Sequence, residues 1–260
     1  MKSFIKSFAR TLLSLFGKEF QLEYWQIKRN EKSTLIPISK FYDGFVKPGM
    51  KIIDVGANVG TYSKVFLELG AEVIGMEPQK YCQNILKIRF KDQERFKLIA
   101  AAAGPKEMKG EIHKSASHTI ASMNKNWINE VTVSKRFWGE KWTEKEEIEV
   151  TTLDHVISEN YVPEYLKIDV EGYELEVLKG LHTAIQIISF EITLPEMKTA
   201  AINCMNEICE LGNYEFIIPH KNLNELGDWK ERSMLLSQLQ TLCEGSEKVS
   251  ADIFCRLKQN

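Results

Sequence analysis

The sequence lacks a charge excess of either sign, and it has no segment that looks like a linker. Its 34 Lys and Arg residues are nearly balanced by 36 Asp and Glu residues, which leaves a formal net charge of −2. Nucleic-acid binding usually shows as a basic excess or stripe, so no nucleic-acid partner is expected. No Pro-, Gly- or Ser-rich stretch divides the chain, and an apolar content of 43% is enough for one sizeable core.

Cysteine is scarce, and its spacing suggests neither disulfides nor a zinc site. The five cysteines are odd in number, scattered, and without a CxxC pair. We expect free or buried thiols, which are typical of a reducing compartment, and therefore a cytoplasmic protein. The five residues are Cys82, Cys204, Cys209, Cys243 and Cys255.

The N-terminal residues contain no apolar run long enough to cross a bilayer and no small-residue cleavage site. Residues 1–20 instead mix basic residues with apolar ones at helical spacing, which predicts an amphipathic helix. A helix that caps the sheet or forms a homo-oligomer contact is favoured, and peripheral contact with an anionic membrane stays open. We assign residues 1–40 to this helix and a lead-in, and residues 41–260 to the main domain.

From Lys51 onward, short apolar runs alternate with helical stretches, which predicts an α/β fold with a mostly parallel central sheet. Two apolar runs near the C-terminus predict that the last strands of that sheet are antiparallel. Polar turns and the run FWGEKWTEKEE interrupt the alternation at about 106–150, so we expect an inserted segment there. Its aromatic residues suit either an acceptor pocket or a small core of their own. Strands are expected at 51–56, 71–78, 96–104, 165–170 and 185–192, with an edge strand and short helix at 147–157, late strands at 214–219 and 251–257, and helices at 60–69, 81–90, 171–180 and 196–211.

A glycine turn between the first strand and its helix is the strongest local signal. Asp54 precedes Gly56 and Gly60, and the GxxxG spacing lacks the extra glycine that the GxGxxG turn of dinucleotide folds uses for the pyrophosphate. The carboxylate of Asp54 is better placed beside a positively charged sulfonium than beside a negatively charged phosphate. Glu77 ends the second strand, where a carboxylate can accept hydrogen bonds from both ribose hydroxyls. The pattern favours S-adenosylmethionine over NAD as the cofactor.

A second signal is LKIDVEG at 166–172, in which a buried strand delivers charges at its carboxyl end. Asp169 and Glu171 are candidates for a general base or for holding a substrate hydroxyl. For Glu171, a role in the first turn of the following helix is an equal alternative. His118, inside the inserted segment, is a further candidate base. No His or Cys pair has ligand spacing, so no metal is assigned, although a magnesium site centred on Asp169 stays open.

Together, DVGANVGTYS at 54–63, EP at 77–78, AAAAG at 100–104, TTLD at 151–154 and LKIDVEGYELEVLKG at 166–180 resemble the FkbM family of methyltransferases in order and spacing. The resemblance implies a class I methyltransferase fold, S-adenosylmethionine as donor, and O-methylation of a hydroxyl on a sugar, glycan or secondary metabolite. It also implies a cofactor site that includes Asp54, Gly56, Asn58, Gly60, Glu77 and Ala102. A non-catalytic nucleoside-binding protein and an NAD-dependent oxidoreductase are the alternatives.

Overall fold

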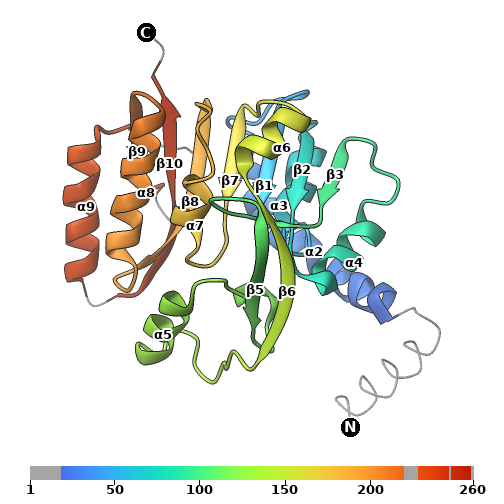
Figure 1. The fold of residues 1–260 in the computed structure, drawn as a ribbon. Helices are drawn as coiled ribbons and strands as arrows, with labels where there is room; N and C mark the ends of the chain where they lie inside the picture. The colour runs from blue at the N-terminus through green and yellow to red at the C-terminus, as the bar shows by residue number, and fades with distance from the viewer. Residues whose placement is uncertain (1–18, 220–227, 246, 259–260) are drawn as a thin grey trace.

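The central feature of the computed structural model is a seven-stranded sheet with the order β3-β2-β1-β7-β8-β10-β9 (Figure 1). The structure describes residues 19–219, 228–245 and 247–258, so most of the helix predicted at 1–20 lies outside the described residues. The strands of this sheet are β1 (Lys51–Val55), β2 (Glu72–Met76), β3 (Phe96–Ile99), β7 (Tyr165–Ile168), β8 (Ile187–Leu194), β9 (Tyr214–Ile217) and β10 (Val249–Leu257).

Strand direction confirms the predicted fold class. β1, β2, β3, β7 and β8 pair in parallel, whereas β10 pairs antiparallel with both β8 and β9. β7 lies directly beside β1, so the ends of the two strands that carry the sequence motifs meet at one edge of the sheet. The strand order changes direction between β1 and β7, where open α/β sheets bind their ligands.

Helices cover both faces of the sheet, because its strands are apolar on both sides. One core contains Ile52 and Phe66 together with residues of α2, and the other contains Ile53 and Val177 together with residues of α8 and α9. The helices are α2 (Glu19–Tyr42), α3 (Thr61–Glu68), α4 (Lys80–Arg89), α5 (Lys125–Val133), α6 (Leu153–Glu159), α7 (Glu174–Leu178), α8 (Lys198–Leu211) and α9 (Arg232–Glu244), with a short 3-10 helix η1 (His118–Ile120). In the part of the chain that the structure describes, no helix has both the length and the apolarity to cross a membrane.

The segment after β3 builds a second, three-stranded sheet from β4 (Ala102–Ala103), β6 (Glu144–Thr151) and β5 (Met108–Lys114), in the order β4-β6-β5. It lies with α5 below the main sheet in Figure 1. Two expectations are wrong here. The strand expected at 96–104 divides, because the chain leaves β3 at Ile99 and pairs Ala102 with Val150. The expected edge strand at 147–157 is the middle strand, β6, with a partner on each side.

Candidate active site

A pocket opens where β1, β2 and β7 end, and β4 and η1 close its other side. It brings together seven of the nine residues singled out in the sequence. These are Gly56 and Asn58 after β1, Glu77 after β2, Ala102 in β4, His118 in η1, and Asp169 and Glu171 after β7. Residues more than 100 positions apart therefore line one cavity.

Glu77 is fixed at the wall of this pocket by backbone donors. The N–H of Asn58 donates to its Oε2 at 2.8 Å, and the N–H of Gln79 donates to its Oε1 at 2.7 Å. Burial raises the pKa of Glu77 to about 7, and these two N–H donors act in the opposite direction. Each carboxylate oxygen has two lone pairs, so both retain capacity for a ligand hydroxyl.

His118 faces the same pocket and is held through its backbone. Its carbonyl oxygen accepts hydrogen bonds from Nδ2 of Asn58 and Nε2 of Gln79, each at 3.0 Å, and its ring lies 5.5 Å from that of Tyr81 between centroids. These contacts connect the inserted segment to the ends of β1 and β2. Gln79 was not singled out in the sequence, where no spacing distinguishes it from an ordinary loop residue.

Asp54 and Gly60 do not line the pocket. Asp54 is buried under α3, where its Oδ2 accepts the hydroxyl of Ser63 at 2.6 Å and its Oδ1 has no hydrogen-bond partner among the described residues. Gly60 has a φ of 80°, and a Cβ there would lie 2.6 Å from Phe90 and 2.7 Å from Leu86. Packing on α4 is therefore enough to require this glycine, and cofactor contact by either residue stays a prediction.

A lysine buried in β7 organises the acids around it. Lys167 pairs in register with Asp54 of β1. Its Nζ lies 2.7 Å from Oδ2 of Asp169 and 4.1 Å from the centre of the Tyr62 ring. Burial alone would lower the pKa of Lys167, but the carboxylates of Asp169 and Asp252 hold it well above its usual value. The ammonium therefore stays charged and orients Asp169 at the pocket edge.

Three carboxylates meet beside this lysine. Oxygens of Asp169, Glu171 and Glu191 lie within 4.8 Å of one another. Burial raises the pKa of Glu171 and of Glu191 well above the usual value, and the charge of Asp169 raises both further. Glu191 was not singled out, although the sequence carries a signal: it is the one charged residue in the apolar run IQIISFEI.

The inserted segment holds the turn that follows Asp169. The hydroxyl of Ser122 donates to the carbonyl oxygen of Glu171 at 2.6 Å, and the Asn124 side chain donates to the carbonyl oxygen of Gly172. Gly172 has a φ of 89°, and a Cβ there would lie 2.3 Å from the Trp127 ring. The backbone of this turn therefore depends on contacts from the insertion.

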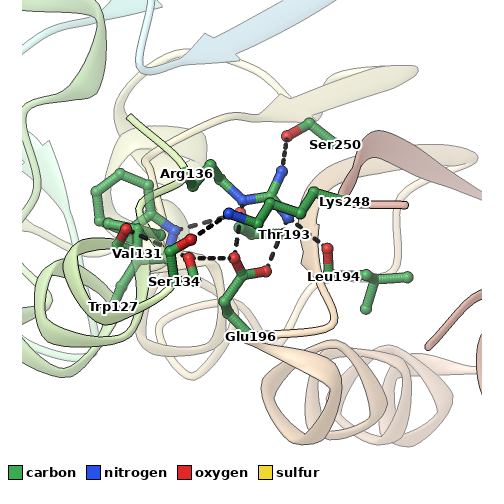
Figure 2. A network of polar contacts seen from close by, with 9 residues as sticks. All are labelled: Trp127, Val131, Ser134, Arg136, Thr193, Leu194, Glu196, Lys248 and Ser250. Carbon is green, nitrogen blue, oxygen red and sulfur yellow. Dashed lines mark hydrogen bonds and ion pairs between the residues drawn. The ribbon is translucent and has the colours of Figure 1, made fainter. Parts of the chain in front are cut away.

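The same segment is anchored to the carboxyl end of β8 by a polar network (Figure 2). Trp127 donates from Nε1 to the Thr193 hydroxyl at 3.2 Å, and Arg136 binds both carboxylate oxygens of Glu196, at 3.2 and 2.7 Å. Trp127, Phe137 and Trp142 pack on one another within 6.5 Å between ring centres, and none of them lines the pocket. These three aromatic residues thus form a small core, whereas Trp138 is 80% exposed.

Comparison with known proteins agrees with the family resemblance of the sequence motifs. The profile of the methyltransferase FkbM domain matches residues 54–216. The methyltransferase sdnD of Sordaria araneosa is 28% identical over 162 residues, which cover 50% of this chain and 60% of that relative, so the chain spans under two thirds of the relative's length.

Two solved structures are similar in fold. A TehB-like SAM-dependent methyltransferase from Corynebacterium glutamicum is 11% identical, with 91% of this chain and 97% of that chain covered and a TM-score of 0.47. Fibrillarin from Aeropyrum pernix with natively bound S-adenosyl-L-methionine is 12% identical, with 84% and 73% covered and a TM-score of 0.40. At these values neither likeness bears on the chemistry of this chain. The match of the family profile over more than half of the sequence shows that the chain belongs to the FkbM methyltransferase family, as its motifs predict.

Proposed function

We propose that this chain is an S-adenosylmethionine-dependent methyltransferase that methylates a hydroxyl oxygen on a sugar, a glycan or a secondary metabolite. The observation that carries the proposal is the pocket at the carboxyl ends of β1 and β7. It has the buried Glu77 on one wall and Asp169 and Glu171 on the other. Membership of the FkbM methyltransferase family supports both the reaction class and the methyl donor.

The residues present fit this cofactor. The pocket lies at the carboxyl ends of β1, β2 and β7, where open α/β sheets bind their ligands. Glu77 would accept the ribose hydroxyls. Ala101, Ala102 and Ala103 line the pocket and would form an apolar wall for the adenine. Gly56 lines the pocket, and its glycine is also required by packing, since a Cβ would lie 1.9 Å from the carbonyl oxygen of Asp169.

When bound, S-adenosylmethionine supplies a sulfonium-activated methyl group to the acceptor oxygen and leaves as S-adenosylhomocysteine. The chain's own residues position the acceptor and take its proton. Asp169, held by Lys167, would accept a hydrogen bond from the acceptor hydroxyl, and Glu171 would remove its proton. His118 on the opposite wall is the alternative base. Because the donor is already activated, orientation is expected to supply most of the acceleration.

The setting in which this reaction occurs is also part of the proposal. All five cysteines are free thiols, which supports a cytoplasmic protein in a reducing compartment. The expected membrane contact through residues 1–20 falls almost entirely outside the described residues. A homo-oligomer and the absence of a nucleic-acid partner remain predictions.

Calorimetry and a methyl-transfer assay test the proposal. We expect the full chain to bind S-adenosylmethionine and not NAD, and to transfer a labelled methyl group onto members of a panel of glycans and hydroxylated metabolites. Failure to bind S-adenosylmethionine at millimolar concentration would refute the proposal. Binding without turnover on any acceptor favours a non-catalytic nucleoside-binding protein, and binding of NAD favours an oxidoreductase.

A further inference from the structure

We propose that Asp169, Glu171 and Glu191 form a binding site for one divalent cation of the Mg²⁺ or Mn²⁺ class. Their carboxylate oxygens lie within 4.8 Å of one another. Oxygen ligands about 2.1 Å from a Mg²⁺ ion lie roughly 3 to 4 Å apart around it, so small side-chain adjustments bring these three into range. A set made of oxygen atoms alone favours such hard cations over zinc or copper.

The second observation is an unsatisfied oxygen on Glu191. Its Oε2 is shielded from solvent and accepts no hydrogen bond in the described part of the chain. The nearby Glu174 is different, because its Oε1 accepts the backbone N–H groups of Val170 and Gly172, each at 3.1 Å. A buried carboxylate oxygen without a partner is costly, and a bound cation would supply one to Glu191.

The charges around the cluster point to a cation as that partner. Lys167 and Arg136 are the positive side chains that act on Glu171. Lys167 is shared, because its Nζ contacts Asp169 and is also attracted by Asp252. Arg136 is held in its ion pair with Glu196 at 2.7 Å. Acids therefore outnumber the available positive groups.

The site is reachable through the pocket, since Asp169 and Glu171 both line it. Lys167 engages only Oδ2 of Asp169, which leaves Oδ1 for the ion. A cation there would bind an acceptor that offers two neighbouring oxygens, such as a vicinal diol, a catechol or an α-hydroxy carboxylate. With Glu171 engaged as a ligand of the ion, the hydroxyl proton would pass to His118, the alternative base. This role of the ion rests on the proposed function, whereas the binding site itself does not.

The test is a Mn²⁺ titration of the full, chelator-treated chain, followed by electron paramagnetic resonance. Glu191→Gln keeps the shape of the side chain and removes its charge, and we expect it to weaken Mn²⁺ binding at least tenfold. Glu147→Gln is the matched control: this glutamate is 73% exposed on β6 and should leave Mn²⁺ affinity unchanged.

Thermal unfolding provides a readout independent of activity. Without metal, Glu191→Gln should melt at least as high as the wild-type protein, because an amide replaces a carboxyl group whose ionisation is disfavoured by burial and by the neighbouring acids. Addition of Mg²⁺ should raise the melting temperature of the wild type and not that of the variant. The inference is overturned if the wild type binds no Mn²⁺ at millimolar concentration, or if both variants bind it as the wild type does. Calorimetry with S-adenosylmethionine separates the two proposals: nucleoside binding without metal binding refutes the cation site alone, and the reverse result refutes the proposed function alone.

Discussion

Replacement of Lys167 by methionine should destabilise the protein strongly, because it removes the positive charge among buried acids. Methionine keeps most of the apolar stem, so the loss is that of the ammonium. That group is 1% exposed, lies 2.7 Å from Oδ2 of Asp169, and contacts the Tyr62 ring. Removing one partner of a buried ion pair costs about 3–5 kcal/mol, since the remaining charge keeps its desolvation cost. For a domain of this size, the melting temperature should fall by roughly 6–20 °C.

The loss should depend on pH in a defined direction. Burial raises the pKa of Asp252 from 3.8 to about 6 in the folded protein, even though Lys167 lowers it. A raised carboxyl pKa contributes stability that is complete below pH 4 and is lost as pH rises through about 6. Without Lys167 the pKa of Asp252 rises further, so this loss extends to higher pH. The variant should therefore be closer to the wild type at pH 5 than at pH 8.

Denaturant unfolding of both proteins at the two pH values measures this difference. Lys64→Met on α3 is the control, because Lys64 forms an exposed i,i+4 pair with Glu68 at 3.1 Å. Its removal should cost no more than about 0.5 kcal/mol. Equal stability of Lys167→Met and Lys64→Met at pH 8 would show that the buried ammonium is not the partner of these acids.

Three further substitutions test other parts of the site. Gly56→Ala places a Cβ 1.9 Å from the carbonyl oxygen of Asp169, at a residue whose φ is 83°. Calorimetry should show loss of S-adenosylmethionine binding, and denaturant unfolding should show a stability loss of at least about 1–3 kcal/mol. Glu77→Gln should weaken the binding of S-adenosylmethionine at least tenfold. The affinity of the wild type should rise as pH increases through about 7, because ribose hydroxyls favour the ionised carboxylate of Glu77. The affinity of the variant should show no such rise. Arg136→Met leaves the buried carboxylate of Glu196, whose pKa is held at about 2, without its cation. Amides of α5 should then exchange faster while those of β1 do not, and equal exchange in both would contradict the anchoring role.

The sequence was sufficient for the parts of the fold that local patterns determine. Apolar runs bounded by glycine located β1, β2 and β7, and the charged end of β7 marked Asp169 as a pocket residue. The departure of the chain from the main sheet after Ile99 has no such local mark, because the alanines at 100–103 suit a strand in either sheet. Pairing with β6, about fifty residues later, decides it. Helix α9, Arg232–Glu244, was also not predicted from the sequence.

Register explains what the sequence left out of the site. Parallel pairing sets Lys167 of β7 opposite Ser189 of β8, an offset of 22 positions, and the same offset carries Asp169 to Glu191. On the next strand, Glu191 pairs with Asp252. Side chains two positions apart share a face, so acids from three strands converge beside one lysine. Glu191 and Asp252 lie in separate apolar runs, and only the register shows that they are neighbours.

The two acids at the end of β7 are held in different ways, which gives them different sensitivities. Asp169 is oriented by Lys167 from the same strand, so its position depends on β7 itself. Glu171 has a φ of 53°, and its backbone is held from the insertion, by the Ser122 hydroxyl at 2.6 Å and by the packing of Trp127 on the next residue. A substitution that loosens the insertion should therefore displace Glu171 and leave Asp169 in place. Trp127→Leu should accordingly lower the methyl-transfer rate more than it lowers the affinity for S-adenosylmethionine, because Glu77, the proposed ribose ligand, lies on the opposite wall. Equal losses in both would indicate that the whole pocket depends on the insertion.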